Sequence, residues 1–288
     1  MPLVPARQML EDAGKNGYCI AGFDVFNLEL LDGVLRACER TSSPVMIQTS
    51  FINFDFYAKE SLCRSVLSAL EAATVPATFH LDHGSREMSF ELIVDCLKLG
   101  FPSVMADGSH LPLEENIALM QRVVAAARPL GAAVEGELGQ VSRDPSAGPE
   151  QIEAMMTDPD EAAEFSEKSG IDFLAISVGS ISGCFDTKRI ELDFDRLERI
   201  AQRVPIPLVF HGGTGIPDEQ MRRAIGLGVA KVNVAHGLRK AFVDAVRAGL
   251  GAGPEYVDPR PALAEAMRRI EEYVEGKLEL FDSVGKAR

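Results

Sequence analysis

Short apolar runs alternate with longer amphipathic segments along most of this chain. The runs are bounded by glycine, proline or polar residues, as buried strands are, and the segments between them carry apolar residues at helical spacing. We interpret as strands residues 18–25, 44–49, 77–82, 103–107, 132–138, 173–178, 207–211 and 231–234. We interpret as helices residues 28–40, 59–73, 88–99, 112–127, 158–169, 195–203, 218–227 and 238–250.

Eight successive strand–helix units predict an α/β fold, a closed (β/α)8 or TIM barrel. The strands are continuous apolar runs, which is what a parallel sheet covered on both faces requires, and right-handed crossovers close such a sheet. Residues 261–281 predict one more long helix. We therefore expect a single domain over residues 1–288, with residues 260–285 as a C-terminal helical extension. Residues 139–156 are rich in Gly, Pro and Ser and predict a long loop, which in a compact domain is often a functional lid.

Composition narrows the possible partners. The chain has 29 Lys and Arg against 43 Asp and Glu, a formal net charge of −14, which argues against nucleic acid and anionic membrane surfaces. Neither a signal peptide nor a membrane-spanning apolar run is apparent, so we expect a cytoplasmic protein. Its five cysteines are scattered without C-x-x-C spacing, which indicates reduced thiols.

Polar side chains stand where the predicted strands end. The run 77–82 closes on Asp82 and is followed by His83 and Gly84. Because all strands of a barrel end on the same face, residues far apart in sequence become neighbours there. The polar residues at these ends are Asp24, Ser50, Asp82, His83, Asp107, Glu135, Glu137, Ser180, Ser182, His211, Asn233 and His236. Each alone also reads as a turn cap or a strand-end residue, but together they predict one site.

Two kinds of binding chemistry are present at this face. His83, His211 and the carboxylate of Glu135 form a ligand set suited to zinc. Residues 211–217 include three glycines just before a predicted helix, which lets the backbone approach an anion. The loops after strands seven and eight are the usual phosphate site of this architecture.

Several motifs resemble those of the class II, metal-dependent ketose-bisphosphate aldolases, which include fructose- and tagatose-bisphosphate aldolases. The resemblance runs from residue 18 to residue 286. The motifs are His80-Leu81-Asp82-His83, residues 103–117, Val134-Glu135-Gly136-Glu137-Leu138-Gly139, His211-Gly212-Gly213-Thr214-Gly215 and Lys231-Val232-Asn233-Val234.

The resemblance implies a carbon–carbon lyase that acts on a ketose phosphate or related hydroxy-ketone through an enediolate. It matches the acid/base aspartate to Asp82, two metal histidines to His83 and His211, and an alternative metal ligand to Glu135. The metal would be Zn²⁺ or another divalent ion, and a monovalent cation is a further candidate. The residues matched or assigned to substrate and phosphate are Ser50, Gly179, Gly212, Thr214 and Asn233. A homodimer or homotetramer is expected, with the C-terminal helix as the candidate interface.

The departures from the family pattern all fall in the predicted site. Ser182 stands where the family has a third metal histidine, which should weaken metal binding. Asp24 replaces an asparagine, and His236 replaces a threonine. Residues 140–145 replace a Gly-Gly-x-Glu-Asp segment that supplies a proton-transferring glutamate, leaving Asp144 or Glu150 as substitutes.

Three readings of these departures stay open. The metal is retained on His83, His211 and Glu135, with water or substrate in the gap at Ser182. Alternatively, Asp24 and His236 form a new acid/base pair, so that a metal-independent lyase or isomerase uses them with Asp82. In the third reading the chain is a non-catalytic aldolase-like subunit.

Overall fold

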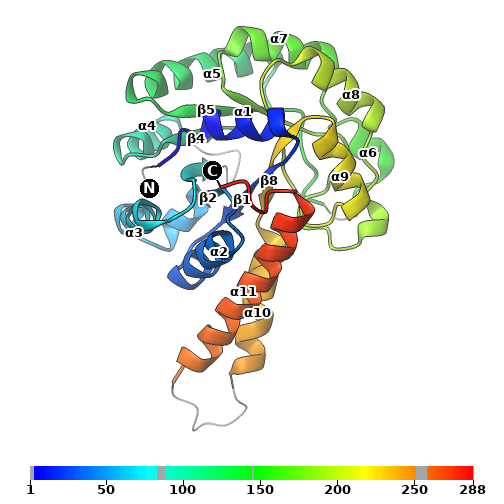
Figure 1. Ribbon diagram of the computed structural model, residues 1–288. Helices are drawn as coiled ribbons and strands as arrows, with labels where there is room; N and C mark the ends of the chain where they lie inside the picture. The colour runs from blue at the N-terminus through cyan, green and yellow to red at the C-terminus, as the bar shows by residue number, and fades with distance from the viewer. Residues whose placement is uncertain (1–2, 83–88, 145, 251–257, 288) are drawn as a thin grey trace.

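The computed structural model describes residues 3–82, 89–144, 146–250 and 258–287, and these form a closed parallel barrel (Figure 1). Each strand pairs in parallel with the next, and β8 closes the barrel on β1. The strands are β1 (Ile20–Asp24), β2 (Val45–Ser50), β3 (Ala77–Asp82), β4 (Ser103–Ala106), β5 (Ala133–Leu138), β6 (Phe173–Ile176), β7 (Leu208–Phe210) and β8 (Val229–Val234). The predicted TIM barrel is confirmed.

Helices cover the outside of this barrel. The α-helices are α1 (Ala6–Asn16), α2 (Leu28–Arg40), α3 (Lys59–Ala72), α4 (Phe90–Lys98), α5 (Leu113–Ala127), α6 (Pro149–Glu153), α7 (Pro159–Ser169), α8 (Phe194–Arg203), α9 (Asp218–Gly226), α10 (His236–Gly249) and α11 (Arg260–Leu280). Short 3-10 helices are η1 (Phe51–Asp55), η2 (Arg128–Leu130) and η3 (Thr187–Arg189). Within the described ranges, no helix combines the length and the apolar character needed to cross a membrane. The five cysteines are buried free thiols, in line with the sequence.

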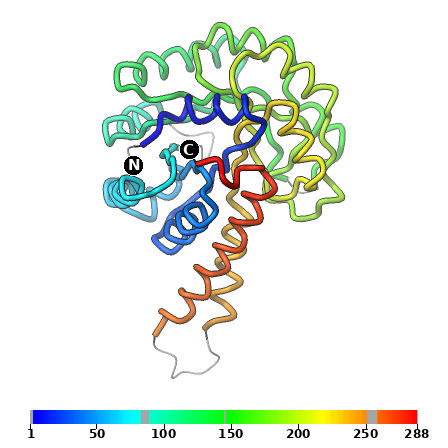
Figure 2. Tube along the Cα trace, viewed as in Figure 1, coloured from blue at the N-terminus to red at the C-terminus, as the bar shows by residue number. Residues whose placement is uncertain are grey.

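The helix α1, which the sequence analysis did not predict, covers the end of the barrel where the strands begin (Figure 2). Its buried residues Ala6, Met9, Leu10 and Ala13 recur at helical spacing and join a cluster of inward-facing strand residues, among them Phe173. This apolar layer seals one end of the barrel, so the opposite end, where the strands finish, is the one left for a site.

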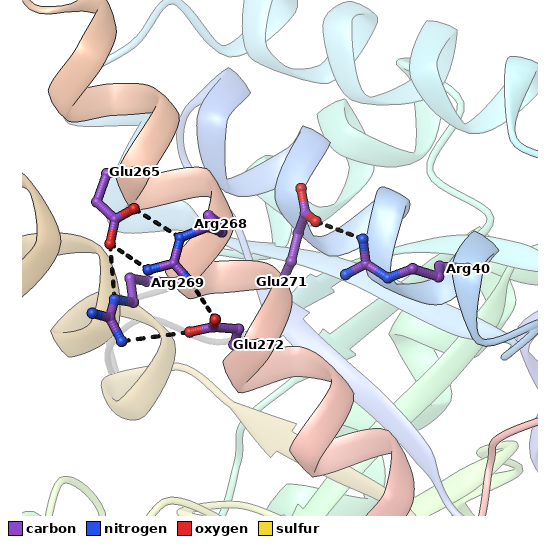
Figure 3. A network of polar contacts seen from close by, with 6 residues as sticks. All are labelled: Arg40, Glu265, Arg268, Arg269, Glu271 and Glu272. Atoms are coloured by element: carbon purple, nitrogen blue, oxygen red, sulfur yellow. Dashed lines mark hydrogen bonds and ion pairs between the residues drawn. The ribbon is translucent and has the colours of Figure 1, made fainter.

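The two C-terminal helices form a hairpin that projects from the barrel (Figure 1). The helix α11 packs on α10 and on α2, and the approach to α2 is close, because a Cβ at Gly33 would lie 2.8 Å from Cγ2 of Ile270. On the surface of the same contact, the Arg40 guanidinium donates to Glu271 at 2.8 Å. Arg268 and Arg269 pair along α11 with Glu265 and Glu272 (Figure 3).

In its described part, residues 139–144 and 146–156, the predicted long loop makes contacts that the sequence did not suggest. The Gln140 N–H donates to the Met155 carbonyl at 2.7 Å, which closes the segment on itself. Ser142 forms a parallel bridge with Ile181, and residues 149–153 form the short helix α6, which begins at a proline as helices often do. The segment is thus fastened over the end of the barrel where the strands finish.

Candidate active site

A cavity of about 660 Å³ opens at the carboxyl ends of the strands. Residues from strands distant in sequence and from the segments after them line this cavity, as the predicted barrel fold led us to expect. Of the site residues taken from the sequence, those that line it are Asp24, Ser50, Asp82, Ser182, His211, Gly212, Thr214, Asn233 and His236. Predicted neighbours Asp107 and Glu137 line it as well. His83 lies outside the described residues.

Two amides hold the carboxylate of Asp82 at the edge of the cavity. The Asn233 side-chain amide donates to Oδ1 at 3.0 Å, and the Gln48 amide donates to Oδ2 at 3.0 Å. Gly22 makes room for both amides, because a Cβ there would lie 2.3 Å from Oε1 of Gln48 and 3.1 Å from Oδ1 of Asn233. Asp82 is therefore fixed in orientation yet open to the cavity, which suits a group that exchanges a proton with a ligand.

His211 connects this carboxylate to a second one beneath the cavity. Its Nε2 lies 2.8 Å from Oε1 of Glu135 and 3.2 Å from Nδ2 of Asn233. Glu135 is fully buried, two residues before Glu137 on β5, and does not itself line the cavity. The predicted residues His211, Asn233 and Asp82 thus form one continuous polar row.

Glu135 receives its other contacts from the interior of the barrel. Oε2 lies 2.6 Å from the Lys231 ammonium and 3.3 Å from Nε2 of His80, and Nδ1 of His80 lies 2.7 Å from the Ser103 hydroxyl. Burial alone would raise the pKa of Glu135, but the Lys231 ammonium and the two imidazoles lower it well below its ordinary value. Burial and the Lys231 charge lower the pKa of His80. The buried layer therefore consists of a carboxylate, an ammonium and a neutral His80.

Asp24 pairs with Arg239 and not, among the described residues, with His236. The Arg239 guanidinium, from the first turn of α10, donates to Oδ2 of Asp24. Burial raises the pKa of Asp24 to about 6, the Asp82 charge adds to this rise, and the Arg239 charge opposes it. The acid/base pair that sequence reasoning proposed between Asp24 and His236 is thus not formed in this structure.

His236 instead faces the segment that carries Ser182. A Cβ at Gly183 would lie 3.1 Å from Nε2 of His236. Partial burial lowers the pKa of His236, and the nearby charges of Arg239 and Arg143 lower it further. His236 is therefore a neutral imidazole near pH 7 at the basic side of the cavity.

The glycine-rich turn after β7 contributes a wall of the cavity. Gly212 has φ +74°, a conformation that favours glycine, and a Cβ there would lie 3.3 Å from the backbone of Ser182. The Thr214 hydroxyl accepts from the Gly237 N–H at 3.1 Å, which ties the turn to the start of α10. Gly179, also assigned to phosphate, does not line the cavity; a Cβ at this residue would lie 2.5 Å from the Glu191 carbonyl.

The donors available for a metal are fewer than the family pattern has. His211 Nε2 and Glu135 Oε1 are an imidazole and a carboxylate facing each other, a combination that divalent zinc accepts. Ser182 adds only a hydroxyl to the cavity wall. Among the described residues, no group of three or more His, Cys, Asp or Glu side chains is arranged to hold a metal ion. The described chain therefore supplies two ligands that fit, and His83 is needed as a third.

The two substitutes for the missing proton-transferring glutamate stay outside the cavity. Asp144 accepts from the backbone N–H and the hydroxyl of Ser146 at 2.7 and 2.6 Å, and neither Asp144 nor Glu150 is among the described residues that line the cavity. In their place, the segment contributes Gln140, Val141, Ser142 and Arg143.

Sequence reasoning missed the functional neighbours Gln48, Lys231 and Arg239. A signal for the first two was present. Side chains of a strand alternate between its faces, so the residue two positions before an inward strand-end residue also points into the barrel. Gln48 stands two before Ser50, and Lys231 stands two before Asn233. A polar residue two positions before an inward strand-end residue therefore points into the barrel as well and belongs to the predicted site.

Comparison with known proteins identifies relatives over the whole barrel. The family model for class II fructose-bisphosphate aldolase matches residues 4–286. The fructose-bisphosphate aldolase of Thermus caldophilus is 37% identical, over 99% of this chain and 100% of the relative. The fructose-bisphosphate aldolase of Streptococcus pyogenes serotype M3 (strain MGAS315) is 38% identical over 100% of both chains.

Solved structures give the same result. The YdjI aldolase from Escherichia coli K12 superimposes with a TM-score of 0.85 at 34% identity, over 99% of this chain and 100% of that one. A putative fructose-1,6-bisphosphate aldolase from Coccidioides immitis has a TM-score of 0.85 at 31% identity, over 98% of each chain. The similarity therefore covers the barrel and the C-terminal hairpin together.

Proposed function

Because the chain belongs to the class II fructose-bisphosphate aldolase family, we propose that its cavity makes and breaks a carbon–carbon bond of a ketose phosphate or related hydroxy-ketone. The observation that carries this proposal is the carboxylate of Asp82, held by two amides at the edge of a cavity that His211 shares. Fold alone would not fix the reaction, since barrels of this kind host many chemistries.

In the proposed cleavage, Asp82 removes the proton from the hydroxyl on the carbon that becomes the aldehyde. The carbon–carbon bond then breaks, the aldehyde leaves, and the electron pair stays on the donor half as an enediolate. In the condensation direction, Asp82 returns the proton to the oxygen of the aldehyde. The Gln48 amide comes from β2, the strand next to that of Asp82, and the Asn233 amide comes from β8. The two donors therefore orient the carboxylate without blocking its cavity side.

The ligand set for a divalent metal would be His211 and His83, with Glu135 as the alternative third ligand. When bound, such a metal supplies positive charge that stabilises the oxygens of the donor half. Lys231 holds Oε2 of Glu135, so that Oε1 stays directed at His211. We assign the phosphate of the donor half to the turn of Gly212 and Thr214.

The test is a cleavage assay of the zinc-loaded protein on a panel of ketose phosphates. We expect cleavage of at least one, and an Asp82→Asn variant should lose about 10²–10⁴-fold in kcat, the usual contribution of a general acid/base. Asp32→Asn, a change to an exposed carboxylate on α2, is the matched control and should retain the wild-type rate.

Absence of cleavage of every panel member with any divalent metal would contradict the proposal. So would an Asp82→Asn variant that is as active as the wild type, which is the behaviour of a non-catalytic subunit. Thermal unfolding of each variant confirms that the fold is retained.

A further inference from the structure

Several buried side chains at the cavity each carry a polar atom without a hydrogen-bond partner in the described part of the chain, Asp24, Ser50 and Asn233 among them. Asp24 is 1% exposed and Ser50 is 4% exposed, and both line the cavity. Among the described residues, neither Oδ1 of Asp24 nor Oγ of Ser50 has a hydrogen-bond partner. Buried polar atoms in folded proteins are almost always paired, and leaving one unpaired is costly. The cavity is the side from which a bound molecule can supply the missing partner.

These two groups are neighbours, and they adjoin the proposed acid/base. Ser50 stands opposite Asp82 in the register of β2 with β3, and Asp24 stands opposite Gln48 in the register of β1 with β2. The backbone N–H of Ser50 and the charge of Asp82 both act on the pKa of Asp24, which places the three groups together. A ligand atom bound by Asp24 and Ser50 would therefore lie next to the oxygen that Asp82 serves.

The chemistry of the pair selects what can bind there. An ionised carboxylate only accepts hydrogen bonds, so its partner must be a donor such as a hydroxyl. The charge of Asp24 is balanced by Arg239, which is already engaged at Oδ2. Among the described residues that line the cavity, the carboxylates are Asp24, Asp82, Asp107 and Glu137, and the guanidinium groups are those of Arg143 and Arg239.

Of the two described arginines that line the cavity, Arg239 is engaged by Asp24, and Arg143 is the other. Arg143 is close to His236, at the start of α10, because its charge acts on that imidazole. This is the side of the glycine-rich turn, where the donor phosphate is assigned. A second phosphate on the aldehyde half would instead lie beside the carboxylate of Asp82, which two neutral amides hold, and beside Asp24, whose arginine is already engaged. Like charges at short range repel.

We propose that Asp24 and Ser50 form a subsite for a hydroxyl of the aldehyde half, and that the aldehyde is an uncharged hydroxyaldehyde. Building on the function proposed above, this makes the substrate class a ketose monophosphate, with its one phosphate on the donor half. Asp24 and Ser50 are then specificity-determining residues.

The experiment is condensation by the zinc-loaded protein with dihydroxyacetone phosphate as the donor. D-Glyceraldehyde and D-glyceraldehyde 3-phosphate are compared as acceptors by kcat/KM. The wild type should favour the uncharged aldehyde by about tenfold or more, and Asp24→Asn should shift the ratio toward the phosphorylated aldehyde by about tenfold, the scale of one partly screened like-charge contact. The exposed Asp32→Asn change is the control and should leave the ratio unchanged.

Ser50→Ala gives an independent test. It should lower kcat/KM for glycolaldehyde about tenfold, the cost of one lost hydrogen bond, and leave kcat/KM for acetaldehyde unchanged because that aldehyde lacks the hydroxyl. An equal loss on both aldehydes would indicate a purely structural role and contradict the subsite.

A wild-type preference for glyceraldehyde 3-phosphate, or a ratio that Asp24→Asn does not move, would overturn the inference while leaving the aldolase function intact. No condensation with any aldehyde and any divalent metal would instead overturn the proposed function, and the subsite with it.

Discussion

At the residue scale, Glu135 joins the cavity to the interior of the barrel. One oxygen faces His211, which lines the cavity, and the other faces Lys231 and His80, which are fully buried. A buried carboxylate without a cation is very unfavourable, so the Lys231 ammonium is what allows Glu135 to stay ionised beneath the cavity. Lys231 does not line the cavity itself, but it positions Glu135, which contacts the cavity residue His211.

We predict that Lys231→Met destabilises the protein by about 3–5 kcal/mol, because it leaves Glu135 as a buried charge without its ammonium. The double variant Lys231→Met, Glu135→Gln removes both charges and should recover part of this loss. Urea unfolding at neutral pH measures the effect. Lys240→Met, which removes an exposed ammonium on α10, is the control and should cost about 1 kcal/mol or less. A Lys231→Met variant as stable as the wild type would contradict the role of the ammonium.

The raised pKa of Asp24 predicts a pH dependence of stability. Its pKa is about 6 in the folded protein against an ordinary 3.8, so the folded state holds this proton more tightly than the unfolded state. The free energy of unfolding therefore falls as pH rises from about 4 to about 6, by about 3 kcal/mol for this group. Asp24→Asn should lack that part of the fall. Denaturant unfolding at several pH values measures it, and parallel curves for the two proteins would show that Asp24 does not titrate in this range.

Sequence reasoning identified the polar residues at the strand ends but not the pairing of Lys231 with Glu135 beneath the cavity. Asp82, His211 and Asn233 were found because they end apolar runs that a barrel brings together. Lys231 was noted only as part of the motif Lys231-Val232-Asn233-Val234 and was given no role, whereas the barrel interior pairs it with Glu135 from a strand far away in sequence. Such a pairing depends on the relative height of the strands in the barrel, which one sequence does not specify.

At the element scale, the contact between α2 and α11 combines a tight apolar seam with ion pairs at its edge. Ile270 is fully buried against Gly33, while Arg40 is about half exposed and pairs with Glu271 and Glu275 (Figure 3 shows the pair with Glu271). Salt bridges in water contribute little, because solvent screens them and the side chains lose freedom. The apolar seam is therefore what holds α11 on the barrel.

We predict that Ile270→Ala lowers the free energy of unfolding by about 2–5 kcal/mol, through the cavity it leaves in this seam. Arg40→Ala, at the edge of the same contact, should cost no more than about 1 kcal/mol. Denaturant unfolding of both variants compares the two contributions. A larger loss from Arg40→Ala than from Ile270→Ala would reverse this assignment.

The strands were predicted with their ends within two residues of those observed, because buried parallel strands are apolar runs with clear limits. The helix α1 was missed although Ala6, Met9, Leu10 and Ala13 recur at helical spacing, because small and polar residues weaken that pattern. The segment at residues 139–156 was interpreted as an irregular loop. The bridge between Ser142 and Ile181 joins segments distant in sequence, and no local pattern predicts such a contact.

At the scale of the whole molecule, the barrel separates a sealed end from an end that carries the cavity. The α10–α11 hairpin projects to the side of the barrel (Figure 1). The expected homodimer or homotetramer stays a prediction, with the C-terminal helix α11 of this hairpin as the candidate interface.

The arrangement of strand ends also predicts how metal affinity can be raised. Ser182 lies on the cavity wall beside Gly212, the residue that follows His211. Ser182→His would place a further imidazole there, and we expect the affinity for zinc to rise by at least about tenfold. Competition with a chelator measures this without reference to activity. Ser146→His, at an exposed residue that is not among those lining the cavity, is the control. An unchanged affinity in Ser182→His would mean that His211 does not face a metal site.

A crystal structure of the zinc-loaded protein with dihydroxyacetone phosphate tests most directly whether the strand ends form the aldolase site. We expect the phosphate at the turn of Gly212 and Thr214, the metal on His211, and free space beside Asp82 where an aldehyde would bind. Dihydroxyacetone phosphate bound away from the strand ends, or a metal that does not contact His211, would contradict this expectation.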